Sequence, residues 1–142
     1  MQYKIILFLL FIIIFSACNP GKKDIAEIND VLDIRITAMN KQDKKAMSYV
    51  IADEYPGRKE FLENFQIQSL YFEELEYDLL KRFIADYSVI SSVAEVEQEY
   101  NLKYKMPGKD AVWLKNKKEK ITLKKGDHGW KIIGGLSPEK KK

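Results

Sequence analysis

The spacing of apolar residues changes once along this chain, from a helical period to a strand period, near Phe72. Before that point, Ile25, Ile28, Leu32 and Met39 recur at helical spacing and would form one apolar stripe. After it, apolar and polar residues alternate, which is typical of strands that bury one face. Helices followed by strands predict an α+β fold in which the helices pack on a sheet.

Three helices are expected in the first half of the chain. Asp24 and Glu27 have the spacing of a capping box at the start of the first helix. Asp43 can cap a second helix, which Pro56 should end because proline forces the preceding residue out of helical geometry. A third, shorter helix would bury three residues: Phe61, Leu62 and Phe65.

Four strands are expected to form an antiparallel meander. Leu75, Tyr77 and Leu79 mark the first strand, and we interpret Lys81–Ser92 as the continuation of one long bent strand. The turn around Gly126–Gly129 predicts a final hairpin. The clearest strand would place six residues on one face: Ala94, Val96, Gln98, Tyr100, Leu102 and Tyr104.

The other face of that strand is acidic, and the following strand is basic. We expect opposite-charge cross-strand pairs here, which stabilise antiparallel sheets. The acids are Glu95, Glu97 and Glu99, and the bases are Lys118, Lys120 and Lys124. Local pairing of this kind explains the uneven charge better than a basic surface that binds nucleic acid.

The first residues are typical of an export signal, with an apolar run from Ile5 to Phe15 and then small residues. The run is shorter than the roughly 20 residues that span a membrane. The segment resembles a bacterial lipoprotein signal, whose recognition residues would be Phe15, Ser16 and Ala17. That resemblance implies diacylation of Cys18, although the motif prefers Leu, Val or Ile where Phe15 stands. The expected organisation is a signal peptide over 1–17, a lipidated tether over 18–23, a domain over 24–136 and a charged tail over 137–142.

Composition excludes several kinds of site. Cys18 is the only cysteine, so there is no second cysteine for an intramolecular disulfide or for a zinc site built on several cysteines. His128 is the only histidine and lies in a Gly-Asp-His-Gly turn, so a multi-histidine metal site is excluded. We predict no metal and no cofactor. Export and the lack of an aromatic-rich basic motif also make nucleic acid an unexpected partner.

The order of elements resembles the nuclear transport factor 2-like (SnoaL-like) superfamily, in which helices pack into the concave side of a strongly bent sheet. Three segments carry this resemblance: the Ile25–Met39 helix followed by Asp43, the strand pair around 94–96 and 118–123, and the terminal Gly129-Trp130-Lys131-Ile132. It covers about residues 24–136 and implies a cone-shaped cavity. Many such domains dimerise through the open sheet face, and the sequence leaves a homodimer open.

Two functions remain open from the sequence. The first is a non-catalytic envelope protein that binds a small apolar ligand or another protein. Its candidate cavity-lining residues are Tyr77, Gln98, Tyr100, Trp113 and Trp130. The alternative, which the resemblance implies, is an isomerase or dehydratase that uses a carboxylate base in the cone. Asp53 or Asp78 would be that base and Tyr55, Tyr77 or Tyr100 the proton donor, but none lies in a catalytic motif.

The expected location is the bacterial cell envelope, with attachment to a membrane through lipidated Cys18. The sequence does not distinguish the inner from the outer membrane.

Overall fold

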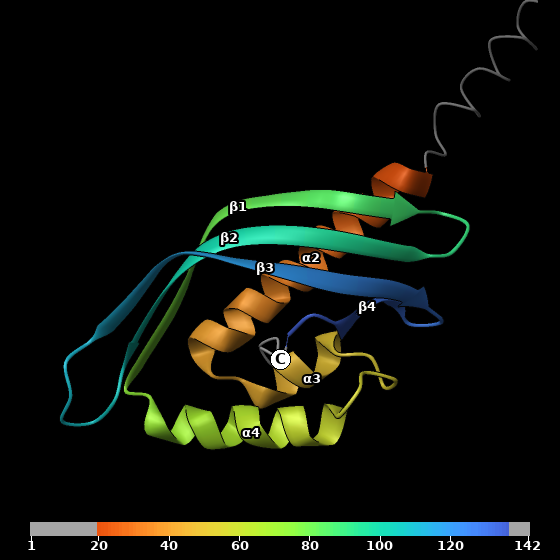
Figure 1. Cartoon of the computed structure of the whole chain (residues 1–142). Helices are drawn as coiled ribbons and strands as arrows, with labels where there is room; N and C mark the ends of the chain where they lie inside the picture. The colour runs from red at the N-terminus through yellow and green to blue at the C-terminus, as the bar shows by residue number, and fades with distance from the viewer. Residues whose placement is uncertain (1–19, 137–142) are drawn as a thin grey trace, which may run out of the picture.

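The computed structural model describes residues 20–136. Helices α2 (Pro20–Lys41), α3 (Lys44–Val50) and α4 (Arg58–Tyr71) come first along the chain. Strands β1 (Glu74–Ser88), β2 (Val93–Lys105), β3 (Val112–Gly126) and β4 (Gly129–Gly134) follow. The strands form one antiparallel sheet in chain order, and the sheet curves over the helices (Figure 1). The predicted α+β architecture is confirmed.

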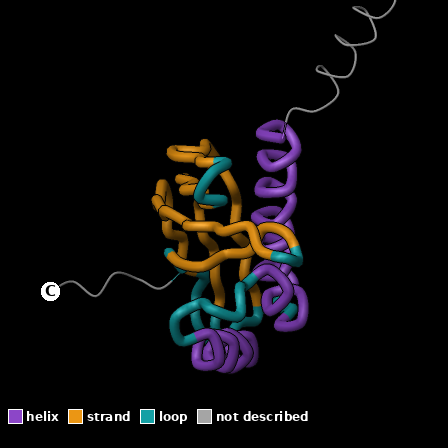
Figure 2. The backbone as a smooth tube through the Cα atoms, turned by 90° about the vertical axis from the view of Figure 1, so that its right-hand side faces the viewer, coloured by secondary structure: helices purple, strands orange, loops and turns teal. Residues whose placement is uncertain are grey.

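Helix α2 runs along one face of the sheet, which we call the inner face (Figure 2). It contacts β1 and β4, and α3 packs between α2 and β4. Helix α4 contacts α3 and lies at one end of the domain (Figure 1).

The core lies between this helical layer and the inner face. Full burial of one large aliphatic side chain contributes roughly 1.5–3 kcal/mol to folding, so these residues dominate the stability of the domain. The helices provide Ile28, Leu32, Met47 and Val50, and the strands provide Val96, Ile121, Leu123 and Ile132.

The sheet bends where its register shifts. The β1–β2 pairing shifts between Leu79 and Lys81 and again between Ile84 and Asp86. The β2–β3 pairing shifts between Tyr100 and Leu102. An extra residue in one strand bends it and increases its twist. The long bent strand predicted from the sequence is therefore confirmed as far as Ser88, and residues 89–92 form a turn.

The predicted helix ends need three corrections. Helix α2 already includes Asp24, whose carboxylate faces Tyr87 and Trp130 instead of capping the helix. Helix α3 ends at Val50, well before Pro56, because Ile51 leaves the helix and bridges to β4. The third helix has 14 residues against seven in α3, so it is not the shorter one.

The cap at Asp43 is confirmed, since its side chain accepts a hydrogen bond from the Ala46 N–H at 3.0 Å.

The outer face of the sheet carries the predicted charge pairs. Glu97 lies opposite Lys120 and Glu99 opposite Lys118, and Lys120 Nζ also lies 2.9 Å from Glu95. Lys124 lies opposite Val93, so the prediction that Lys124 pairs with an acid across the strands is wrong.

The predictions for Phe15, Ser16, Ala17 and Cys18, and for the tail over 137–142, concern residues outside the described part of the chain. Helix α2 covers residues 20–23, which the sequence assigned to the tether. None of the described helices is long and apolar enough to cross a membrane.

Candidate functional site

A buried ion pair joins the helical layer to the centre of the sheet. Arg35 on α2 donates two hydrogen bonds to Glu119 on β3, at 2.7 Å from Nη1 to Oε1 and 3.0 Å from Nη2 to Oε2. The two side chains are only 6% and 12% exposed. Two parallel bonds of this kind fix the relative orientation of both groups as well as their separation.

Two further side chains complete the coordination of Glu119. The Tyr77 hydroxyl donates to Glu119 Oε1, and Gln98 Nε2 donates to the same oxygen at 3.1 Å. Gln98 is itself buried, and its amide oxygen accepts a hydrogen bond from Arg82 Nε. We call Arg35, Tyr77, Gln98 and Glu119 the inner network.

Charge balance decides the protonation of the inner network. Burial opposes ionisation of Glu119, but the charge and hydrogen bonds of Arg35 overcome it and lower the pKa of the Glu119 carboxyl. Burial and the negative charge of Glu119 raise the pKa of the Tyr77 hydroxyl well above its ordinary value. Glu119 therefore stays ionised and Tyr77 protonated at neutral pH, with Glu119 oxygens already engaged.

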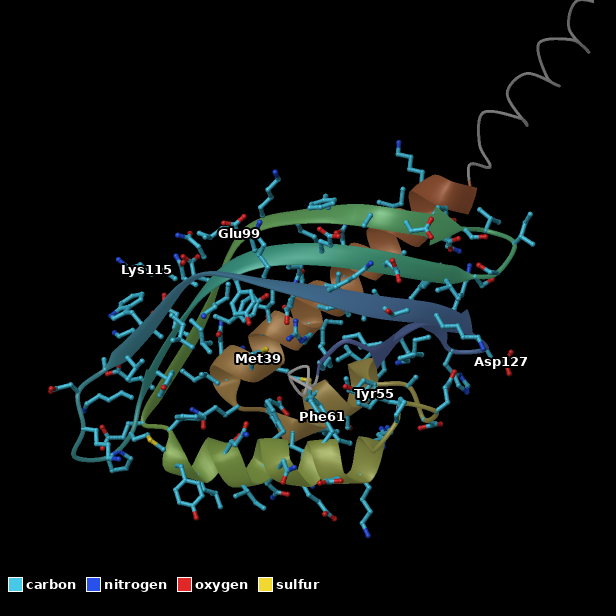
Figure 3. All side chains as sticks on the ribbon, viewed as in Figure 1. Met39, Tyr55, Phe61, Glu99, Lys115 and Asp127 are labelled. Atoms are coloured by element: carbon cyan, nitrogen blue, oxygen red, sulfur yellow. The ribbon has the colours of Figure 1, made fainter. Side chains whose placement is uncertain are left out.

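An open hollow of about 830 Å³ lies beside the inner network. Its inner-face side includes Met39, Tyr100 and Leu136 as well as Arg35 and Glu119. Charged residues of the outer face also border it: Lys81, Glu97, Glu99, Lys118 and Lys120. Figure 3 shows Met39 beneath the sheet and Glu99 above it. The hollow thus combines a small apolar area with a polar floor and a charged border.

The structure brings three of the five candidate lining residues together. Tyr77 and Gln98 belong to the inner network, and Tyr100 stacks on Tyr77 with 4.3 Å between ring centroids. Trp113 lies on the outer face, half exposed, beneath the Lys103 ammonium. Trp130 is buried near the start of α2, away from this cluster.

Trp130 belongs to a second polar cluster around Asp24. The Asp24 carboxylate accepts hydrogen bonds from Lys125 Nζ at 2.8 Å, Tyr87 at 2.6 Å and Trp130 Nε1 at 3.1 Å. The bonds from Lys125 and Tyr87 hold the pKa of Asp24 at about 2. This cluster fastens the start of α2 to β1, β3 and β4.

The acids named from the sequence as catalytic bases face solvent. The Asp53 side chain is fully exposed, and Asp78 lies on the exposed side of β1. His128 lies in the exposed turn between β3 and β4. Within residues 20–136, no group of acidic, histidine or cysteine side chains is arranged to hold a metal ion.

The two central residues of the site, Arg35 and Glu119, were not predicted from the sequence. A signal for both existed, since Arg35 falls in the apolar stripe of α2 and Glu119 shares the phase of Ile121 and Leu123. A charged residue in a buried phase needs a partner, because an unpaired buried charge is costly. The two lie 84 residues apart, so only the folded chain pairs them.

Comparisons with known proteins identify the fold. No family model matches the sequence, and no curated protein matches it. A nuclear transport factor 2-like superfamily protein from Salmonella enterica serovar Typhimurium superposes with a TM-score of 0.69 at 14% identity, over 84% of this chain and 95% of that one.

Two other solved structures carry enzyme descriptions. A proposed dehydratase of the nuclear transport factor 2-like family from Streptomyces avermitilis has a TM-score of 0.67 at 15% identity, over 80% of this chain and 94% of its own. A proposed aromatic ring hydroxylase from Novosphingobium aromaticivorans has a TM-score of 0.71 at 16% identity, over 85% and 93%. Helices in the concave side of a bent meander, shared with these structures, identify the domain as having the nuclear transport factor 2-like fold.

Proposed function

We propose that this chain is an exported, lipid-anchored protein whose domain binds a small molecule without transforming it. The observation that carries the binding role is the engagement of Glu119 by Arg35, Tyr77 and Gln98. A general base needs a free lone pair and a pKa near the working pH. Glu119 has its pKa lowered instead, so it offers a fixed polar surface.

The hollow indicates the chemistry of the ligand. Met39, Tyr100 and Leu136 offer apolar contact, and the network beneath them is polar. A site that combines an apolar area with fixed polar groups suits a ligand that has both an apolar part and a polar part, because the polar groups fix its orientation. We therefore favour a small amphipathic molecule over an envelope protein as the partner.

The anchor is supported by the sequence around Cys18. Ser16 and Ala17 precede it after an apolar run, and no second cysteine exists for it to pair with. Placement in the cell envelope follows from this proposal, and either membrane remains compatible with it.

The anchor is tested by comparing the native protein with Cys18→Ser. We expect the native protein in the membrane fraction with the added mass of acyl chains, and the variant in the soluble fraction. An intact mass that shows unmodified Cys18 would refute the anchor.

Ligand binding is tested by native mass spectrometry of the detergent-solubilised protein. Met39→Trp should fill part of the hollow and remove a retained small molecule. Gln68→Trp, at an exposed position of α4, is the matched control and should keep it. Retention by both variants would place the ligand elsewhere, and the absence of any bound molecule in the native protein would count against the proposal.

A second candidate function is an isomerase or dehydratase. The direct contact of the Tyr77 hydroxyl with Glu119 favours it, because an acid beside a phenol can serve as base and donor. Similar structures include proposed dehydratases. For this chemistry Arg35 must release Glu119 when substrate enters.

Titration of the Glu119 carboxyl carbon by NMR separates the two functions. A pKa below the ordinary glutamate value, with or without the retained ligand, supports binding. A pKa that rises toward neutral when ligand is present supports the enzyme. The variant Glu119→Gln lacks this carboxylate, so the NMR signal that disappears in its spectrum is assigned to Glu119.

A further inference from the structure

The turn between β1 and β2 carries two exposed apolar side chains at its tip. Val89 is 52% exposed and Ile90 is 99% exposed. Turns normally favour glycine, proline, asparagine, aspartate and serine, each for a backbone reason. The β2–β3 turn follows that rule with Pro107 and Gly108, and the exposed Lys109 comes next.

The serines of the β1–β2 turn make its hydrogen bonds. The Ser91 N–H donates to Ser88 Oγ at 3.2 Å, and Ser92 Oγ donates to the Val89 carbonyl at 3.4 Å. Neither apolar side chain is needed for these bonds. Val89 and Ile90 therefore project from a turn that the serines hold in shape.

This tip lies at the end of the domain where the described chain begins. Asp24, one turn into α2, bonds Tyr87 just before the tip. It also bonds Lys125, whose N–H donates to the Ser92 carbonyl at 2.9 Å. Figure 1 shows the start of α2, the β1–β2 turn and the β3–β4 turn at this same end.

The distance from this end to the proposed anchor is short. Pro20 follows Cys18 by two positions, with only Asn19 between them, a span of at most about 7 Å. Four residues of helix from Pro20 to Asp24 add about 6 Å. The interfacial layer of a bilayer is itself about 5–8 Å deep on each side. An anchor at Cys18 thus holds Asp24 close to the membrane, and Asp24 bonds Tyr87 at the base of the tip.

Charges at this end nearly cancel. Lys22, Lys23, Lys124 and Lys125 are accompanied by Asp24, Glu27, Asp86 and Asp127. This end of the domain therefore has little net charge with which to attract anionic lipid. Its distinctive feature is the apolar tip.

We propose that Val89 and Ile90 insert into the interfacial layer of the membrane that holds the Cys18 anchor, so that the domain stands with this end on the bilayer. This inference rests on the proposed lipid anchor. Insertion of the tip orients the domain, with the β2–β3 turn directed away from the membrane. Strand β2 runs between the two turns and has 13 residues, so they lie far apart.

The test uses the acylated mature protein, in which Cys18 is blocked and an introduced cysteine is the only free thiol. Ile90→Cys and the control Lys109→Cys are each labelled with an environment-sensitive fluorophore. Each protein is reconstituted into vesicles of phosphatidylethanolamine and phosphatidylglycerol, with and without lipids that carry a quencher at a shallow acyl position. We expect blue-shifted emission and strong quenching at position 90, unchanged in high salt, and neither effect at position 109.

Three results would overturn the proposal. Equal emission and quenching at positions 90 and 109 in an acylated, membrane-bound protein would refute insertion while leaving the anchor intact. Loss of the position 90 signal in high salt would show electrostatic adsorption in place of apolar insertion. An intact mass without acyl chains would refute the anchor, and the inference would fail with it.

Discussion

Replacement of Glu119 by leucine tests the central ion pair most directly. The change leaves the Arg35 guanidinium, whose side chain is 6% exposed, without its counter-charge. Removal of one partner from a buried pair costs about 3–5 kcal/mol. That is a large part of the roughly 5–15 kcal/mol that holds a domain folded. At about 4 °C per kcal/mol for a domain of this size, the midpoint of thermal unfolding should fall by about 12–20 °C.

The double variant Arg35→Met with Glu119→Leu separates the unpaired charge from lost packing. Replacing both partners of a buried pair with apolar residues of similar volume is often neutral or stabilising. Tyr77 and Gln98 still lose an acceptor, at about 1–3 kcal/mol for each unsatisfied group. We expect the double variant to be at least about 2 kcal/mol more stable than Glu119→Leu alone.

Urea unfolding followed by tryptophan fluorescence measures these differences, with circular dichroism to establish that each variant is folded. The stabilising role of the Arg35–Glu119 pair is refuted if Glu119→Leu lowers the unfolding free energy by under about 1 kcal/mol, far below the cost of an unpaired buried charge. It is also refuted if the losses of the two single variants simply add in the double variant, because residues that interact do not show additive effects.

Three further predictions concern other parts of the fold. Asp24 has its pKa lowered from 3.8 to about 2, so its contribution to stability is complete above the ordinary value and is lost as the pH falls toward about 2. The difference in unfolding free energy between the native protein and Asp24→Asn should therefore shrink below pH 3.8, and a difference that grows there would contradict the cluster. Gly135 has φ +91° and no room for a Cβ, which would meet the Lys120 carbonyl at 2.0 Å. Gly135→Ala should thus lower the free energy of unfolding by more than the roughly 1–2 kcal/mol that a left-handed backbone costs a residue with a Cβ. The control Gly108→Ala, with open space around the added Cβ, should lower it by no more than that amount. Reversal of Lys118 and Lys120 to glutamate should lower the thermal midpoint, because like charges then face each other across β2 and β3; an unchanged midpoint in low salt would show that the pairs do not matter.

The sequence was sufficient to predict the architecture because the patterns that specify helices and strands are local. A helical stripe and an alternating strand need only the neighbours of each residue, and both periods are read directly from the chain. The cap at Asp43 and the hairpin after Gly126 are equally local features. Helix ends were less well predicted, because tertiary partners compete for the same groups. Asp24 faces the sheet, and Ile51 leaves α3 to bridge to Ile132.

The site could be predicted only in part. Gln98 stood out among the inner-face residues of β2 as the amide between Val96 and Tyr100, and Tyr77 and Tyr100 lie with it on the inner face. Trp113 was predicted on the wrong face because the β2–β3 pairing shifts register between Tyr100 and Leu102, so β3 residues on the two sides of the shift differ in phase. A bulge in a strand changes which face of the sheet the residues beyond it occupy, and no local sequence pattern indicates this bulge.

The sequence by itself determined the order of the elements and the inner faces of most strand segments, and the place of the chain at a membrane stays a prediction. The tertiary structure decided which charges meet. Arg35 and Glu119 are distant in sequence and become partners only when α2 packs on the inner face of the sheet. The reason is physical: periodicity shows which side of an element is buried, but the pairing of buried charges depends on packing angle and strand register, which only the assembled fold specifies.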